Sequence, residues 1–161
     1  MTTPSPGLGL PPAQAGYAAI GLHNPKNPQN VGGVLRAAYC FGAALVAIAG
    51  SRYRPQSTDT AKAYRFLPIV QVDDLHSVIP FDCVPVAVER RAGAIALPGY
   101  AHPERAFYLF GPEDGDLGHA LTRWCRDVVY IPSDHSLNLA AAVNIVLYDR
   151  LAKQMRGGGR V

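Results

Sequence analysis

Cysteine is scarce in this sequence of 161 residues, which contains three, at positions 40, 83 and 125. They lie far apart and form no CxxC pair, so their spacing indicates neither a disulfide framework nor a zinc site. The five histidines are scattered as well, without the spacing of metal ligands. We therefore expect no metal cofactor and a location in the reducing cytoplasm.

Long apolar runs are absent too. No run approaches the roughly 20 residues that a membrane-spanning helix requires. The first 16 residues, MTTPSPGLGLPPAQAG, lack the basic and apolar regions of a secretory signal. These two absences predict a soluble protein without a membrane partner.

Two glycine signatures of nucleotide-binding proteins are also missing. The sequence contains neither the GxGxxG pattern of dinucleotide-binding folds nor the GxxxxGK[ST] pattern of phosphate-binding loops. Their absence argues against a nucleotide-binding α/β enzyme such as a dehydrogenase.

Charged residues are few, at 17% of the chain, whereas hydrophobic residues make up 48%, and the net charge is +3. This composition allows one domain to bury a substantial core. The basic residues gather at 52–54, 90–91 and 153–160, which suits a polyanionic partner, although solvated basic faces are commoner than binding sites.

The pattern along the chain predicts one α/β domain over 17–155, between a disordered tail at 1–16 and a flexible basic tip at 156–161. Short apolar runs predict strands at 17–22, 44–49, 84–88, 107–110 and 128–131. Helical patterns fall at 30–42, 59–65, 73–78, 117–125 and 137–155. Such alternation is typical of a mostly parallel sheet covered by helices on both faces.

The first segment of interest is NPQNVGGVLRAAYCFGA, residues 27–43. At 100° per residue, an apolar stripe forms from Val31, Val34, Leu35, Ala38 and Phe41. Arg36 points nearly opposite, and on spacing alone an ordinary solvent-facing arginine is the commoner reading. The glycines at 32 and 33 leave a helix face open to a ligand or another backbone. Asn30 is suited to cap this helix.

Two further segments follow predicted strands. FYLFGPEDGDLG, residues 107–118, ends a strand in a glycine-rich acidic turn, which is either a plain connection or part of a ligand site beyond the strand ends. In VVYIPSDHSLNLAAAVNIVLYDRLAK, residues 128–153, Ser136 stands where an N-cap would open a long helix. Asn138 and Asn144 then lie in that helix and require partners. For Asn144 we favour a neighbouring helix or subunit, whereas Asn138 is better placed to reach a site.

Taken in order, these segments resemble the three motifs of the SpoU-type (TrmH-like) branch of the SPOUT superfamily of RNA methyltransferases, over residues 18–152. The resemblance implies an α/β SPOUT fold with a deep trefoil knot in its C-terminal part, and a homodimer. It also implies S-adenosylmethionine as methyl donor and 2′-O-methylation of a ribose in RNA, with tRNA favoured over rRNA. A knotted RNA-binding or assembly protein that has lost catalysis is the alternative.

The resemblance also assigns residues to the site. The catalytic set is Asn30, Arg36, Glu113, Ser136 and Asn138. The cofactor-binding set is Val88, Glu89, Gly111, Glu113, Ile131, Ser136 and Leu137. The guanidinium of Arg36 suits a clamp on the phosphate beside the reacting ribose, either in its own subunit or across the dimer. One departure is the loop between Pro132 and Ser136, which has only three residues, 133–135, where many members have more.

Overall fold

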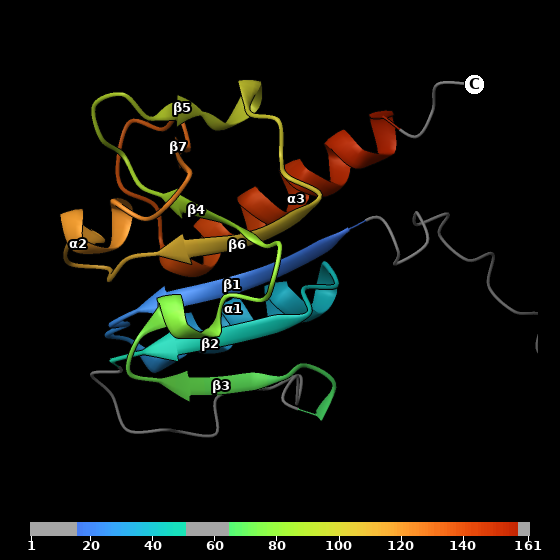
Figure 1. The fold of residues 1–161 in the computed structure, drawn as a ribbon. Helices are drawn as coiled ribbons and strands as arrows, with labels where there is room; N and C mark the ends of the chain where they lie inside the picture. The colour runs from blue at the N-terminus through green and yellow to red at the C-terminus, as the bar shows by residue number, and fades with distance from the viewer. Residues whose placement is uncertain (1–15, 51–64, 158–161) are drawn as a thin grey trace, which may run out of the picture.

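The computed structural model describes residues 16–50 and 65–157, and in them all strands run parallel in one sheet of seven. The order across the sheet is β3-β2-β1-β6-β4-β7-β5 (Figure 1). The strands are β1 Tyr17–His23, β2 Leu45–Ala49, β3 Ile69–Val72, β4 Val84–Val88, β5 Ile95–Ala96, β6 Arg105–Phe110 and β7 Asp127–Tyr130. The predicted α/β class with a mostly parallel sheet is confirmed.

Two α-helices and two 3₁₀ turns lie between these strands in the described part of the chain, and a third α-helix follows the last strand. They are α1 Pro28–Cys40, η2 Leu75–Val78, η3 Leu97–Gly99, α2 Gly118–Thr122 and α3 Leu139–Gly157. The helix predicted at 73–78 is a single 3₁₀ turn, and the one at 117–125 shrinks to five residues. The helix predicted at 59–65 and the tail at 1–16 fall almost entirely outside the described residues. Strands β3 and β5 were not predicted, because four and two residues are too short to show a period.

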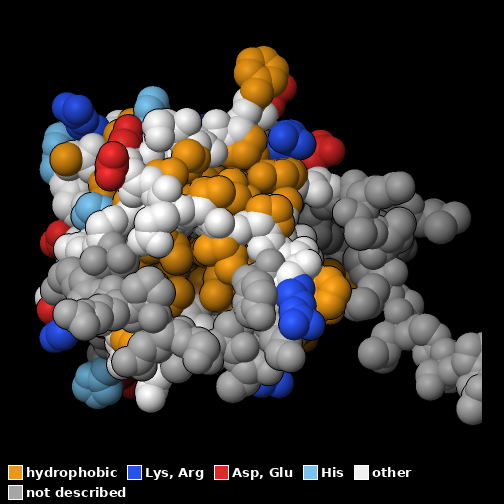
Figure 2. Space-filling view, turned by 90° about the horizontal axis from the view of Figure 1, so that it is seen from below, with side chains coloured by type: hydrophobic (Ala, Val, Ile, Leu, Met, Phe, Trp, Pro, Cys, Tyr) orange, Lys and Arg blue, Asp and Glu red, His pale blue; other side chains and the backbone are white. Residues whose placement is uncertain are grey.

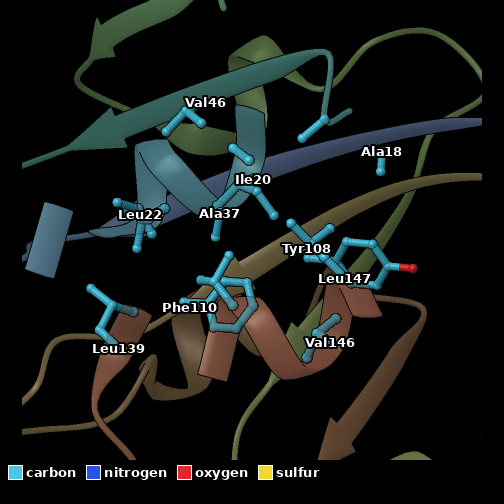
Figure 3. Packing of buried hydrophobic residues seen from close by; sticks show 14 of the residues in the cluster. Ala18, Ile20, Leu22, Ala37, Val46, Tyr108, Phe110, Leu139, Val146 and Leu147 are labelled. Carbon is cyan, nitrogen blue, oxygen red and sulfur yellow. The ribbon is translucent and has the colours of Figure 1, made fainter. Parts of the chain in front are cut away.

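Helices α1 and α3 cover one face of the sheet, while η2 lies over the other (Figure 1). The predicted stripe of α1 is confirmed, since Val31, Val34, Leu35 and Ala38 are buried and Phe41 packs partly buried against them. Their neighbours come from the sheet and from α3, among them Ile20, Tyr108 and Val146 (Figure 3). On the other face, Leu75, Phe107 and Leu117 form a second cluster.

One glycine of the first segment is explained by the packing of α1 on α3. A Cβ atom added to Gly33 would lie 2.7 Å from the Cβ of Ala140, closer than two such atoms can approach. The glycine therefore brings the start of α3 against α1. Of the two possibilities for this face, a ligand or another backbone, the structure shows the second at Gly33, because helix α3 of the same chain fills that space.

Because only 17% of the residues are charged, hydrophobic side chains remain on the surface. On the face seen in Figure 2, hydrophobic side chains form a central area, and the acidic and basic side chains lie mostly toward its rim.

The parallel arrangement brings three connections to one end of the sheet. Strand β4 lies between β6 and β7, with Val88 in register with both Phe110 and Val129. The segments that leave β4, β6 and β7 therefore start side by side, at the end where α2 lies (Figure 1). Ligands bind at this end of open α/β sheets.

Candidate functional site

A cavity of about 340 Å³ opens at the ends of these three strands. Its volume falls in the range of small-molecule sites. Its walls come from the segments after β4, β6 and β7 and from the first turn of α3. All the residues that the resemblance assigns to the cofactor lie on these walls, namely Val88, Glu89, Gly111, Glu113, Ile131, Ser136 and Leu137.

The loop after β6 is shaped by a glycine. A Cβ atom on Gly111 would lie 3.1 Å from both the carbonyl carbon of Asp116 and the amide nitrogen of Leu117. Such contacts are tighter than side chains normally make, so glycine lets residues 111–117 fold back on themselves. The main chain of this loop is thereby exposed to the cavity.

Side chains from the three sequence segments meet in one hydrogen-bonded chain. Asn30 of α1 donates from Nδ2 to Glu113 Oε1 at 2.8 Å. Asn138 donates from Nδ2 to Asn30 Oδ1 at 2.6 Å. The Oδ1 atom of Asn138 accepts from the amides of Ala140 at 2.9 Å and Ala141 at 3.2 Å. The chain links the loop after β6, helix α1 and the N-terminus of α3.

This chain corrects two predicted helix caps. Helix α1 begins at Pro28, and Asn27 is its cap, since its side chain accepts from the amide of Gln29 at 2.8 Å. Asn30 therefore lies inside the helix with its amide directed at Glu113. Helix α3 is capped by Asn138 in place of Ser136, because Asn138 receives the first free amides of the helix. In both cases the helix starts at a different residue than predicted, at Pro28 for α1 and at Leu139 for α3, so the residue directly before that start is the cap.

Glu113 is held as a carboxylate. Partial burial works to raise its pKa, but the hydrogen bond from Asn30 and those from backbone amides outweigh it, so the pKa lies below its usual value. The amides are those of Lys26 at 2.9 Å and Asn27 at 3.2 Å. At neutral pH Glu113 is therefore an acceptor that orients Asn30.

The remaining predicted residues lie apart from this chain. Arg36 is exposed on α1 and is not among the residues described as lining the cavity. Ser136 and Leu137 lie on the cavity wall, and Leu137 is 40% exposed. Asn144 donates to the carbonyl of Ala140 at 2.8 Å, so its partner is its own helix, not a neighbouring helix or subunit as predicted.

Sequence reasoning missed Arg90, which lies on the cavity wall. Its guanidinium donates to the carbonyl oxygen of Ser133, and to Ser133 Oγ at 3.0 Å. Next to it, Glu89 Oε1 accepts from the amide of Leu117 at 3.2 Å. Burial raises the pKa of Glu89, and the charge of Asp116 adds to this. The only signal in the sequence was the basic pair at 90–91, which we assigned to a surface cluster.

Within the described residues, no group of three or more histidine, cysteine, aspartate or glutamate side chains is arranged to hold a metal ion. In the same part of the chain, none of the helices has the length and apolar character needed to cross a membrane.

Comparisons with known proteins agree with this geometry. The model of the SpoU rRNA Methylase family matches residues 17–148. A curated relative, 23S rRNA (uridine(2479)-2′-O)-methyltransferase from Streptomyces viridochromogenes, is 27% identical over 96% of this chain and 59% of its own length. The chain thus spans about three fifths of that relative.

Solved structures share the fold. The SpoU methyltransferase AviRb from Streptomyces viridochromogenes, in complex with the cofactor AdoMet, matches 92% of this chain and 64% of its own with a TM-score of 0.76 at 23% identity. A structure described as giving insights into the 2-OH methylation of C/U34 on tRNA matches 88% of this chain and 92% of its own, with a TM-score of 0.72 at 25% identity.

Proposed function

The chain belongs to the SpoU rRNA methylase family, and from this premise we propose that it transfers a methyl group from S-adenosylmethionine to a ribose 2′-hydroxyl of RNA. The observation that carries the proposal is the chain from Glu113 through Asn30 to Asn138. It joins all three sequence segments at the edge of one cavity. Such joining of distant polar residues beside a cavity is the usual sign of an active site.

The cavity suits S-adenosylmethionine. Apolar side chains, including Val88 and Ile131, form part of its wall, and Gly111 exposes main chain to it. An adenine ring requires apolar surfaces, and its polar edge requires main-chain donors and acceptors. When bound, the molecule supplies an activated methyl group. The residues of this chain then have to fix its position and bring the ribose to it.

Positioning is the contribution that we assign to the polar residues. A ribose hydroxyl reacts only when held in line with the methyl group, and such orientation supplies much of the rate. Glu113 lies on the cavity wall and fixes Asn30, which in turn fixes Asn138, so the three form one hydrogen-bonded group that begins at the cavity. Ser136 also lies on the cavity wall and is suited to hydrogen-bond the nucleotide or the donor.

Arg36 is the residue that we assign to the RNA. Its guanidinium can bind the phosphate next to the reacting ribose through two parallel hydrogen bonds. Because Arg36 is exposed and is not among the residues described as lining its own cavity, we propose that it acts at the cavity of a second subunit in a homodimer.

An apolar surface on α3 supports the dimer. Ile145, Tyr148 and Met155 are 38%, 62% and 50% exposed, and Tyr148 stacks edge-on against Phe41 of α1. Large apolar side chains gathered on one surface mark interaction sites. Mixing Arg36→Ala with Asn138→Ala subunits tests the arrangement, since a mixed dimer regains one complete site only if Arg36 acts across subunits. If the mixture stays inactive while mixed dimers form, Arg36 acts within its own subunit.

For the RNA we propose tRNA. The support is the solved structure described as giving insights into the 2-OH methylation of C/U34 on tRNA, which matches 88% of this chain at 25% identity with a TM-score of 0.72.

Methyl transfer is tested with labelled S-adenosylmethionine and separated tRNA and rRNA. After digestion to nucleosides, we expect the label on a ribose from the tRNA fraction. Label from the rRNA fraction would reverse the choice of RNA, and label on a base would contradict 2′-O-methylation. Binding of S-adenosylmethionine without transfer to any RNA would favour a non-catalytic RNA-binding protein.

A further inference from the structure

The two residues that follow β4 hold opposite walls of the cavity. Strand β4 lies between β6 and β7, so its end faces the loops that leave both neighbours. Glu89 bonds to the loop after β6, and Arg90 bonds to the loop after β7. Both side chains reach the cavity wall.

On one side, Arg90 ties the short loop between β7 and α3. Its Nη2 atom donates to both the carbonyl and the hydroxyl oxygen of Ser133. The hydroxyl of Ser133 lies 2.9 Å from the carbonyl of His135, to which it donates. Since only three residues separate Pro132 from Ser136, a tie at Ser133 also fixes Ile131 and Ser136 on the wall.

On the other side, Glu89 anchors the loop between β6 and α2. Its Oε1 atom accepts from the amide of Leu117, which is buried just before α2. Its Oε2 atom is buried and finds no hydrogen-bond partner in the described part of the chain. A buried carboxylate oxygen without a hydrogen-bond donor costs free energy. The other oxygen of Glu89 binds the amide of Leu117, at the end of the loop that begins at Gly111.

We propose that Glu89 and Arg90 are positioning residues, a two-sided brace that holds loops 111–117 and 131–137 in the shape that binds S-adenosylmethionine. The proposal rests on the proposed function and gives Glu89 a role in shaping the wall in place of direct contact with the donor. Loops that are ordered before binding lose less conformational entropy when the ligand arrives, so the brace raises affinity.

The test compares Arg90→Ala with a matched control, Arg91→Ala. Arg91 is the next residue and donates to Thr122 Oγ1 at 2.7 Å, but it is not among the residues described as lining the cavity. Binding of S-adenosylhomocysteine is measured by calorimetry, and hydrogen exchange is followed at the amides of 131–137. Loss of two charge-assisted hydrogen bonds in Arg90→Ala is expected to weaken binding about tenfold. Hydrogen exchange at 131–137 becomes faster in Arg90→Ala, whereas Arg91→Ala changes neither the binding nor the exchange.

A second pair of variants tests the other wall. Glu89→Gln keeps an oxygen that accepts from the amide of Leu117, so it retains most of the affinity for S-adenosylhomocysteine. Glu89→Ala lacks this oxygen, so it binds S-adenosylhomocysteine more weakly and its amides at 111–117 exchange faster. In turnover, both alanine variants raise the KM for the donor by a larger factor than they lower kcat.

The outcomes separate the brace from the function on which it rests. If the wild-type protein does not bind S-adenosylhomocysteine, the proposed function is wrong. If it binds and both alanine variants bind equally well with unchanged exchange, the brace alone is wrong.

Discussion

Helix α3 takes part in two polar networks with different surroundings. At its start, Asn138 joins Asn30 and Glu113 beside the cavity, on side chains that are largely exposed. About three to four turns on, Asp149, Arg150 and Lys153 join His102 and Tyr108 in a second, more buried network. The first network consists of two amides and a carboxylate, and its Glu113 lies on the cavity wall, whereas no residue of the second network is among those described as lining this cavity.

The inner network has one consistent arrangement of protons. Arg150 donates to the hydroxyl oxygen of Tyr108 at 3.2 Å, and that hydroxyl donates to His102 Nδ1 at 2.6 Å. His102 Nε2 then donates to Asp149 Oδ2 at 2.8 Å, which also lies 2.6 Å from Lys153 Nζ. Each of these hydrogen bonds gives a partner to a polar group whose burial without one would cost free energy. We propose that the outer network serves function and the inner network serves stability, and the following variants test this difference.

The largest effect is expected at Arg36, outside both networks. Arg36→Ala removes the proposed phosphate clamp and lowers kcat/KM on the order of a thousandfold, about 4 kcal/mol of activation free energy. Affinity for S-adenosylhomocysteine, dimer mass and melting temperature stay near the wild-type values, because Arg36 is exposed. Kinetics, calorimetry and light scattering measure these quantities. A large loss of donor binding would contradict the role assigned to Arg36.

The next effect is on stability. Arg150 is 5% exposed, and its guanidinium donates to the carbonyls of Pro103 at 2.5 Å and Glu104 at 2.6 Å. Arg150→Met fills similar space but removes the guanidinium donor from these carbonyls and from the hydroxyl oxygen of Tyr108, and we expect a loss of about 3 kcal/mol in the free energy of unfolding. Urea denaturation measures it. Activity per folded molecule at low temperature is retained. A variant as stable as wild type but inactive would reverse the comparison between the networks.

Asn30 should show the opposite pattern. Asn30→Ala breaks the link between Glu113 and Asn138 and lowers kcat by roughly 30-fold, about 2 kcal/mol, while unfolding changes by less than about 1 kcal/mol. The matched control is Asn144→Ala, since that amide donates to the carbonyl of Ala140 in its own helix and we expect turnover to stay unchanged. Equal losses in both variants would show that the outer network carries no special role.

The sequence predicts the framework of this molecule better than its networks. The stripe of α1 and the alternation of strands and helices are local patterns, so the parallel sheet was predictable. Asn27 and Asn30 both suited the cap of α1, and only the start of the helix decides between them. Gly33 required knowledge of Ala140, more than 100 residues away, and Arg90 required the position of Ser133. Contacts between distant segments leave no periodic signal, and the site consists of such contacts.

The smallest expected effect is a difference between the two networks in how the free energy of unfolding depends on pH. Burial lowers the pKa of His102 from its usual 6.5, against the opposing influence of Asp149. The unfolded chain therefore binds a proton at this histidine at a pH where the folded chain does not, and stability falls as the pH drops below about 6.5. The pKa of Glu113 is also lowered, but from 4.5, so its contribution, less than about 1 kcal/mol at an exposed site, is lost only below that pH.

Between pH 6.5 and 5 the inner network should therefore weaken while the outer one persists. We expect the free energy of unfolding to fall over this range, with affinity for S-adenosylhomocysteine nearly constant. Burial also lowers the pKa of His23, so this histidine adds to the slope. His102→Gln, which cannot titrate, is the control and should reduce the slope at a lower overall stability. Glu113→Gln should keep the slope, because its titration lies at lower pH. A slope as steep in His102→Gln as in the wild type would assign the pH dependence to other groups and remove this distinction between the two networks.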